Sequence, residues 1–101
     1  STQLKSLPTL KTFYYFRKMK NKQHYVYILK SLQSPQELYT GLTSDLKRRL
    51  NQHNQGSSKH TAKFKPWKIH AAFWFSKPEI AIEFEKYLKS GSGRAFRNKH
   101  F

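Results

Sequence analysis

Residues 24–31, HYVYILKS, contain the pattern that most constrains the fold of this chain. Successive side chains of a β-strand point to opposite faces of a sheet. A strand here would therefore place Tyr25, Tyr27 and Leu29 on one face, and Val26 and Ile28 on the other. The pattern predicts a strand with two tyrosines on the same side.

Two further runs are typical of strands. Residues 38–43, LYTGLT, follow the polar stretch SLQSPQE, in which Pro35 favours a turn. Two short runs joined in this way predict an antiparallel hairpin, with Tyr39 across from the first strand. Residues 68–75, KIHAAFWF, are predicted as a third strand because they are rich in aromatic and other β-forming residues.

Residues 45–55 are predicted to form a helix with Thr43 or Ser44 as its N-cap and Gly56 closing its C-terminus. Asp45 would lie in its first turn, where the helix dipole favours a negative charge.

The same helix separates two neighbouring arginines. Leu46 and Leu50 form its apolar stripe, and residues four apart share a flank, so Arg49 and His53 would lie together beside that stripe. Arg48 is predicted to point elsewhere.

A second helix is predicted after a capping box formed by Ser76 and Glu79. At 100° per residue, Glu85 falls at the margin of its apolar stripe. A carboxylate there needs a cationic partner, for which Arg49, a bound metal ion and the i,i+4 residue Lys89 are the alternatives. The stripe consists of Ile80, Ala81, Phe84 and Leu88.

The remaining segments are predicted to be less regular. Residues 57–68 are basic and contain Pro66, which predicts a loop with one helical turn. Residues 91–94, GSGR, are predicted to form a turn into a short terminal helix. They lack the lysine spacing of a phosphate-binding P-loop.

Composition narrows the partners of the chain. Its 101 residues suit one domain, and 20 Lys and Arg against 5 Asp and Glu give a net charge of +15. This charge favours nucleic acid as the partner. No apolar run approaches the roughly 18 residues of a membrane span, and we expect no membrane partner. The absence of cysteine excludes disulfides and thiol catalysis and agrees with a reducing, cytoplasmic compartment of bacterial type.

Residues 1–23 are predicted to be an extension of the domain at residues 24–101. They contain six basic and no acidic residues and show no sustained periodicity. The alternatives are a disordered tail, an organelle-targeting segment, and a tail that lengthens the nucleic-acid footprint.

Three stretches in order, YVYIL, YTGLTSDLKRRLNQHN and EKYLKSGSGR, resemble the GIY-YIG nuclease family, in a compact stand-alone form similar to the N-terminal nuclease domain of the bacterial excision-repair subunit UvrC. The resemblance runs from about Tyr25 to Phe101. It implies an α/β fold in the broad α+β sense, a small three-stranded antiparallel sheet flanked by helices.

The resemblance assigns site residues one by one. The tyrosine of the first motif is Tyr27, and the second motif is residues 39–41, beginning with Tyr39. The family's arginine falls on Arg49, and His53 stands where relatives have histidine or tyrosine. The metal-binding glutamate falls on Glu85, in a Glu-x-x-Leu-Lys run.

The chain also departs from the family's pattern. Tyr25 stands where the first motif has its glycine, and Leu42 stands where many relatives carry lysine. The spacing through Gly91 and Gly93 differs from the family's, so we do not assign a role to Asn98.

The resemblance implies a metal-dependent endonuclease that cleaves DNA with Mg²⁺ or Mn²⁺ at Glu85, in repair or recombination. Arg49 suits the phosphate because guanidinium can bind two of its oxygens. Tyr27, Tyr39 and His53 are alternatives for positioning or deprotonating the attacking water. Expected nucleic-acid contacts are Lys47, Arg48, Lys59, Lys63, Lys65 and Arg94.

Two rival functions are open from the sequence. One is a non-catalytic basic module that binds DNA or RNA, with the tyrosines stacking on bases. The other is a domain that works within a larger repair assembly.

Overall fold

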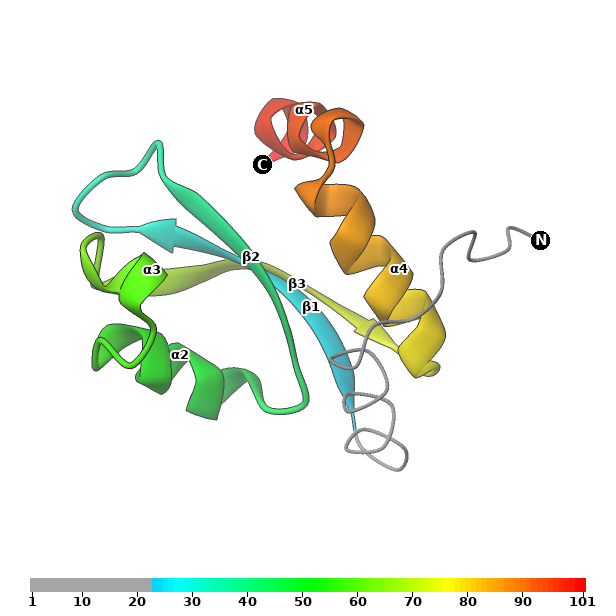
Figure 1. Cartoon of the computed structure of the whole chain (residues 1–101), viewed down its shortest axis with the longest axis horizontal. Coiled ribbons are helices and arrows are strands. Elements are labelled where there is room, and N and C mark those ends of the chain that lie inside the picture. Colours follow the sequence, from blue (N-terminus) through cyan, green and yellow to red (C-terminus); the bar gives the residue numbers. More distant parts are fainter. Residues whose placement is uncertain (1–22) are drawn as a thin grey trace.

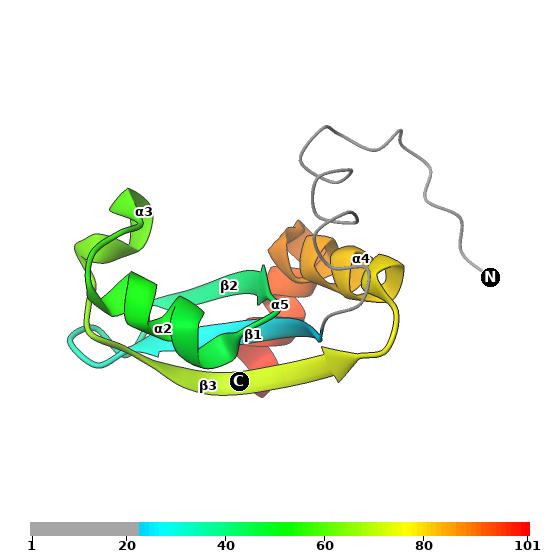
Figure 2. The same ribbon diagram turned by 90° about the horizontal axis from the view of Figure 1, so that it is seen from below.

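The protein is described by a computed structural model that covers residues 23–101. Its centre is a three-stranded antiparallel sheet in the order β2-β1-β3 (Figure 1). The strands are β1 (His24–Ser31), β2 (Leu38–Thr43) and β3 (Trp67–Phe75). The predicted sheet and hairpin are therefore confirmed, and β1 lies between the two edge strands, as Figure 2 also shows.

Helices cover both faces of the sheet (Figure 1). The elements α2 (Leu46–Asn54) and α3 (Lys59–Ala62) lie on one side. The elements α4 (Pro78–Lys89) and α5 (Gly91–His100) lie on the other. The predicted α+β architecture of a small sheet flanked by helices is what the structure has.

The alternation in β1 supplies both cores. Val26 and Ile28 are fully buried and pack with Ala81 and Leu88 of α4. On the opposite face, Tyr27 and Leu29 pack with Trp67. Four partly buried side chains complete this second core: Leu46 and Leu50 of α2, together with Tyr39 and Phe64. Because β1 is buried on both faces, its side chains determine where each helix packs.

The helix termini correct three details of the sequence analysis. Asp45, not Thr43 or Ser44, is the N-cap of α2, and its carboxylate accepts a 3.1 Å hydrogen bond from the Arg48 amide. The N-cap of α4 is Lys77, without a side-chain hydrogen bond, so the predicted capping box is not formed. Pro78 begins this helix instead, with the fixed φ that suits its first turn.

The GSGR stretch is the first turn of α5, not a turn that precedes it. Ser90 is its N-cap, and its hydroxyl accepts a hydrogen bond from the Gly93 amide at 3.2 Å. Gly56, with φ +80°, follows the C-cap of α2 and confirms the predicted end of that helix.

The predicted extension at residues 1–23 lies outside the described part of the chain, apart from its last residue. Within residues 23–101, no helix has the length and apolar character that a membrane span requires.

We predict that Gly93→Ala weakens the packing between α4 and α5, whereas Gly91→Ala does not. A Cβ on Gly93 would lie 1.6 Å from the carbonyl oxygen of Tyr87, which belongs to rigid backbone. We expect Gly93→Ala to lower the free energy of unfolding by about 2 kcal/mol or more. Gly91 has open space at this position, so its alanine variant should change stability by less than about 1 kcal/mol. Denaturant unfolding measures both, and equal effects would contradict the prediction.

Candidate active site

The ring of Tyr27 lies over the neighbouring edge strand β2, on the face of the sheet that α2 covers. Its strand partner on β2 is Gly41, and a Cβ at that glycine would lie 2.3 Å from the Tyr27 hydroxyl oxygen. The phenol ring therefore occupies the space in which any other residue would place its side chain. Close approach, and not only a strand-end position, explains the glycine here.

Beyond Gly41, the Tyr27 hydroxyl meets two side chains of α2. It lies 3.0 Å from Nε2 of His53, and Nε of Arg49 donates a hydrogen bond to it at 3.3 Å. The guanidinium of Arg49 is held further by Gln52, whose Oε1 accepts from Nη1 at 2.9 Å. The predicted common flank of Arg49 and His53 is thus observed, while Arg48 is exposed on another side of α2.

Tyr39 completes an aromatic cluster around the imidazole. Its ring centroid lies 4.9 Å from that of His53 and 6.3 Å from that of Tyr27. Tyr39 is partly exposed, whereas His53 is 0% and Tyr27 2% exposed. The three candidate groups are therefore together, and only Tyr39 has a substantial part of its side chain at the surface.

Burial sets the protonation states of the central pair. The pKa of Tyr27 is raised to about 12, mainly by burial and to a smaller extent by the nearby Tyr39 and Glu85, while Arg49 opposes the increase. Burial also lowers the pKa of His53 to about 4, assisted by the positive charge of Arg49. At neutral pH the phenol keeps its proton and the imidazole is uncharged, so His53 is available as a proton acceptor.

Glu85 reaches the same region from α4. Its carboxylate pairs with the Lys89 ammonium at 2.5 Å, and not with Arg49. The Lys89 nitrogen also lies 5.8 Å from the centroid of the Tyr39 ring. The i,i+4 alternative is therefore the one formed, but the pair lies at the aromatic cluster and not on a distant surface.

The fit of a divalent cation rests on this carboxylate. Its side chain is 16% exposed and already lies against a cation, the Lys89 ammonium. Residues 23–101 contain no group of three or more potential metal-ligating side chains. A single carboxylate suits Mg²⁺ or Mn²⁺ where water and substrate phosphate supply the remaining ligands. Glu85 fits that kind of site, and does not fit a cage made only of protein ligands.

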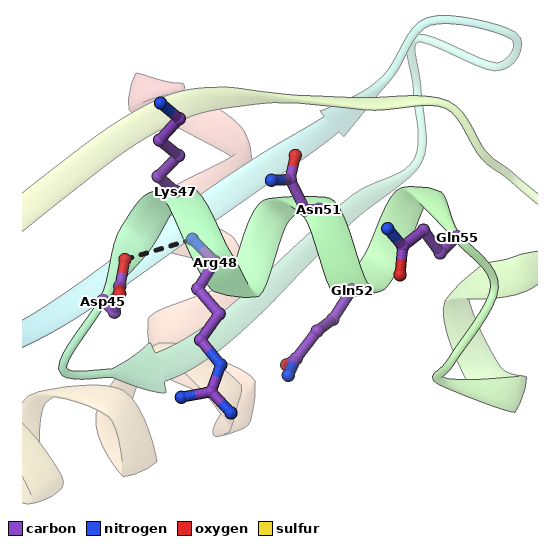
Figure 3. Close-up of a pocket in the computed structure, with 6 residues that line it drawn as sticks. All are labelled: Asp45, Lys47, Arg48, Asn51, Gln52 and Gln55. Atoms are coloured by element: carbon purple, nitrogen blue, oxygen red, sulfur yellow. Dashed lines mark hydrogen bonds between the residues drawn. The ribbon is translucent and has the colours of Figure 1, made fainter.

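The basic residues expected to contact nucleic acid divide into two groups. Lys47 and Arg48 border a shallow hollow on the outward side of α2, together with Gln52 (Figure 3). Figure 3 shows Arg48 and Gln52 extending to the same side of the helix. Lys59, Lys63 and Lys65 are exposed on α3 and the loop after it.

Arg94 is also exposed, but it lies on α5, across the sheet from α2 (Figure 1). On the same helix, Asn98 is exposed, and its side-chain oxygen accepts from Arg97. Leu42 packs in the core beneath α4.

Three contacts at the site were not predicted from the sequence. Thr61 is buried, and its hydroxyl oxygen lies 2.8 Å from Nδ1 of His53. Gln52 holds Arg49, and Lys89 covers Tyr39. Gln52 stands three residues after Arg49, so helical spacing could have indicated it. Thr61 follows a chain reversal and has no periodic relation to His53.

The sequence matches a known family of catalytic domains. The family model described as the GIY-YIG catalytic domain matches residues 23–99, and the chain belongs to this family. A UPF0213 protein of Bacillus licheniformis is 36% identical over 72 residues, which cover 70% of this chain and 72% of that protein.

Two other similarities involve a larger protein and a solved structure. The structure-specific endonuclease subunit SLX1 of Debaryomyces hansenii is 37% identical over 71 residues, 63% of this chain but 20% of that protein. The solution structure of a UPF0213 protein from Bacillus halodurans shares 34% identity and covers 74% of this chain and 79% of that one, with a TM-score of 0.46. The family and the endonuclease relative support a nuclease in general terms.

We predict that Gly41→Ala displaces the Tyr27 phenol. The added methyl and the hydroxyl cannot share a 2.3 Å separation, so the hydrogen bond to His53 should break and stability should fall by about 1–3 kcal/mol. Nuclear Overhauser contacts between the rings of Tyr27 and His53 report the displacement. Gly91→Ala serves as the control, and ring contacts preserved in Gly41→Ala would contradict the prediction.

Proposed function

We propose that this protein is a metal-dependent endonuclease that hydrolyses phosphodiester bonds in DNA. One observation supports this more than any other: the Arg49 guanidinium donates to the oxygen of Tyr27, whose hydroxyl lies against the neutral His53. A cation and a proton-relay pair are thus held together next to a carboxylate. Phosphodiester hydrolysis requires these same groups.

Arg49 supplies charge for the phosphate. The hydrogen bonds that position it use Nε and Nη1 and go to neutral groups, Tyr27 and Gln52. Among residues 23–101, Arg49 forms no salt bridge, so its positive charge is not compensated by a carboxylate. A phosphate beside Nη2 would neutralise that charge, and the charge that builds up on the phosphate during attack would strengthen the interaction.

Tyr27 and His53 provide the path for the proton. His53 is completely buried with both ring nitrogens occupied, so Tyr27 stands between it and an attacking water. The water gives a proton to the Tyr27 oxygen as the phenol gives its own proton to Nε2 of His53. The hydroxide attacks phosphorus, the bond to the leaving oxygen breaks, and that oxygen takes a proton from solvent.

Substrate binding assists this transfer. The charge of Arg49 is one cause of the low pKa of His53. A bound phosphate compensates that charge, so the imidazole becomes a better proton acceptor when substrate is present. Burial, the larger cause, is unchanged by the phosphate.

Glu85 would hold Mg²⁺ or Mn²⁺, which supplies positive charge beside the phosphate and the leaving oxygen. Before a metal ion binds, the ammonium of Lys89 balances the negative charge of Glu85. Tyr39 packs against His53 and limits the motion of the ring.

The direct test is incubation of the protein with single-stranded, duplex and branched DNA and with RNA, in magnesium, manganese or chelator. Metal-dependent cutting of DNA supports the proposal. Salt-sensitive binding without cutting in any metal would favour the non-catalytic nucleic-acid-binding module instead.

We predict that Glu85→Gln reduces cleavage to background and leaves DNA binding nearly unchanged. The variant keeps the shape of the side chain but removes the charge on which the metal depends, and one charge is a small part of a +15 chain. Glu83→Gln, on the same helix, is the matched control and should cut normally. Single-turnover cleavage and a binding titration measure the two properties. Full activity of Glu85→Gln would exclude this carboxylate from the reaction.

We predict that Arg49→Ala slows cleavage about a hundredfold to a thousandfold, the usual loss for a charge-stabilising donor in an active site. Arg48→Ala should cost only a small part of the affinity, because Arg48 is exposed at the α2 hollow. Arg49→Lys should restore little, since the compact ammonium of lysine cannot reproduce the planar guanidinium, which contacts Tyr27 and Gln52 through separate nitrogens. Single-turnover rates at saturating protein compare the three variants. Small and equal effects of the two alanine substitutions would place Arg49 outside the site.

A further inference from the structure

The hydroxyl of Thr61 occupies a fully enclosed position behind the active site. Its oxygen lies 2.8 Å from Nδ1 of His53 and 3.4 Å from the main-chain oxygen of Ser58. Thr61 is 1% and His53 0% exposed. A polar contact in such surroundings must satisfy its hydrogen-bonding groups within the protein.

Two arrangements of hydrogens are possible for this contact. In the first, Nδ1 of His53 carries the hydrogen and donates it to Thr61. In the second, the Thr61 hydroxyl donates to Nδ1, and Nε2 carries the hydrogen. The positions of all four heavy atoms allow either arrangement, so the choice depends on the neighbouring groups.

Only the first arrangement gives each hydrogen an acceptor. The Thr61 hydroxyl then donates to Ser58, as threonines in helices do to a carbonyl three residues earlier. His53 donates from Nδ1 to Thr61, and the Tyr27 hydroxyl donates to Nε2. Arg49 donates to the Tyr27 oxygen.

The second arrangement leaves a buried donor without a partner. Tyr27 would then accept from both His53 and Arg49, and its own hydrogen would have no acceptor among the described residues. Tyr27 is 2% exposed, so water does not readily replace that acceptor. A buried donor of this kind costs about 1–3 kcal/mol. The first arrangement is therefore favoured.

We propose that Thr61 is a positioning residue: by accepting from Nδ1 it acts together with Tyr27 to hold His53 in the tautomer with hydrogen on Nδ1, so that Nε2 can receive the Tyr27 proton. This inference rests on the proposed function for its catalytic consequence, but the tautomer itself does not. In the opposite tautomer Nε2 already carries a hydrogen and cannot accept another. Proton transfer from Tyr27 would then have no destination.

Hydrogen bonds to neighbouring elements fix the position of the short helix α3, which carries Thr61. Trp67 donates from its indole nitrogen to the main-chain oxygen of Thr61 at 2.9 Å. Asn54 in turn accepts from the Trp67 amide and donates to the Trp67 carbonyl. These bonds attach α3 to β3 and to the end of α2, and they hold the hydroxyl of Thr61 at a constant distance from the imidazole.

We predict that Thr61→Val shifts the tautomer population of His53 from hydrogen on Nδ1 toward hydrogen on Nε2, whereas Thr61→Ser does not. Valine matches threonine in shape but cannot accept the hydrogen bond, and serine retains the hydroxyl. Two-dimensional ¹⁵N–¹H spectra of protein labelled at histidine, recorded at neutral pH, distinguish the tautomers. The chain has five histidines, and the signals absent from a His53→Gln sample identify His53.

Cleavage should follow the tautomer. We expect Thr61→Val to lower the single-turnover rate about tenfold to a hundredfold, as when a partner that orients a functional histidine is removed. Thr61→Ser should recover most of the rate. DNA affinity should remain unchanged in both, because Thr61 is buried away from the surface.

Trp67→Phe separates the hydroxyl from the general packing of α3. This change removes the hydrogen bond from the indole to the main-chain oxygen of Thr61 but leaves the Thr61 hydroxyl in place. The proposal expects hydrogen to remain on Nδ1 in this variant even if the protein is less stable. A shift equal to that of Thr61→Val would assign the effect to packing and overturn the proposal.

The remaining outcomes also separate the two proposals. Hydrogen on Nε2 in the unaltered protein, or an unchanged tautomer population in Thr61→Val, overturns the role of Thr61. The expected tautomers together with undiminished cutting by Thr61→Val overturn its catalytic consequence. The expected tautomers in a protein that cuts no nucleic acid would retain the positioning role and contradict the endonuclease function.

Discussion

The passage of the Tyr27 ring across Gly41 is the contact on which the candidate active site depends. Tyr27 belongs to the central strand, and the residues that its hydroxyl meets belong to α2, which packs on one face of the sheet. The ring can lie over the edge strand β2 only because Gly41 has no side chain there. The absence of one Cβ atom therefore leaves room for the phenol to reach Arg49 and His53.

Around this contact the protein buries an uninterrupted series of polar groups from α3 to α2. Each member is satisfied by its neighbour, so the series carries little of the penalty of an unpaired buried group. Burial keeps His53 neutral and Tyr27 protonated at neutral pH. The charge of Arg49 at the outer end has no carboxylate partner among residues 23–101, which makes that end suitable for an anion.

The open edge of β2 allows two layers of the molecule to contribute to one site. Tyr39 lies on the α2 face, while Lys89 and Glu85 belong to α4 on the other face. They meet because β2 is an edge strand, with no further strand beside it among the residues that the structure describes. A central strand would separate the two layers, so the order β2-β1-β3 is a condition for the site and not only for the core.

The sequence by itself determined features that depend on local geometry. Alternation in β1 separated Tyr27 from Val26, and helical spacing separated Arg49 from Arg48, because strand and helix periods are properties of the backbone alone. Tertiary structure decided what depends on residues distant in the chain. The Tyr27 hydroxyl meets Arg49 and His53, Lys89 lies over the ring of Tyr39, and Thr61 reaches His53 only after a chain reversal. No period in the sequence encodes such contacts, since they form when separate elements pack.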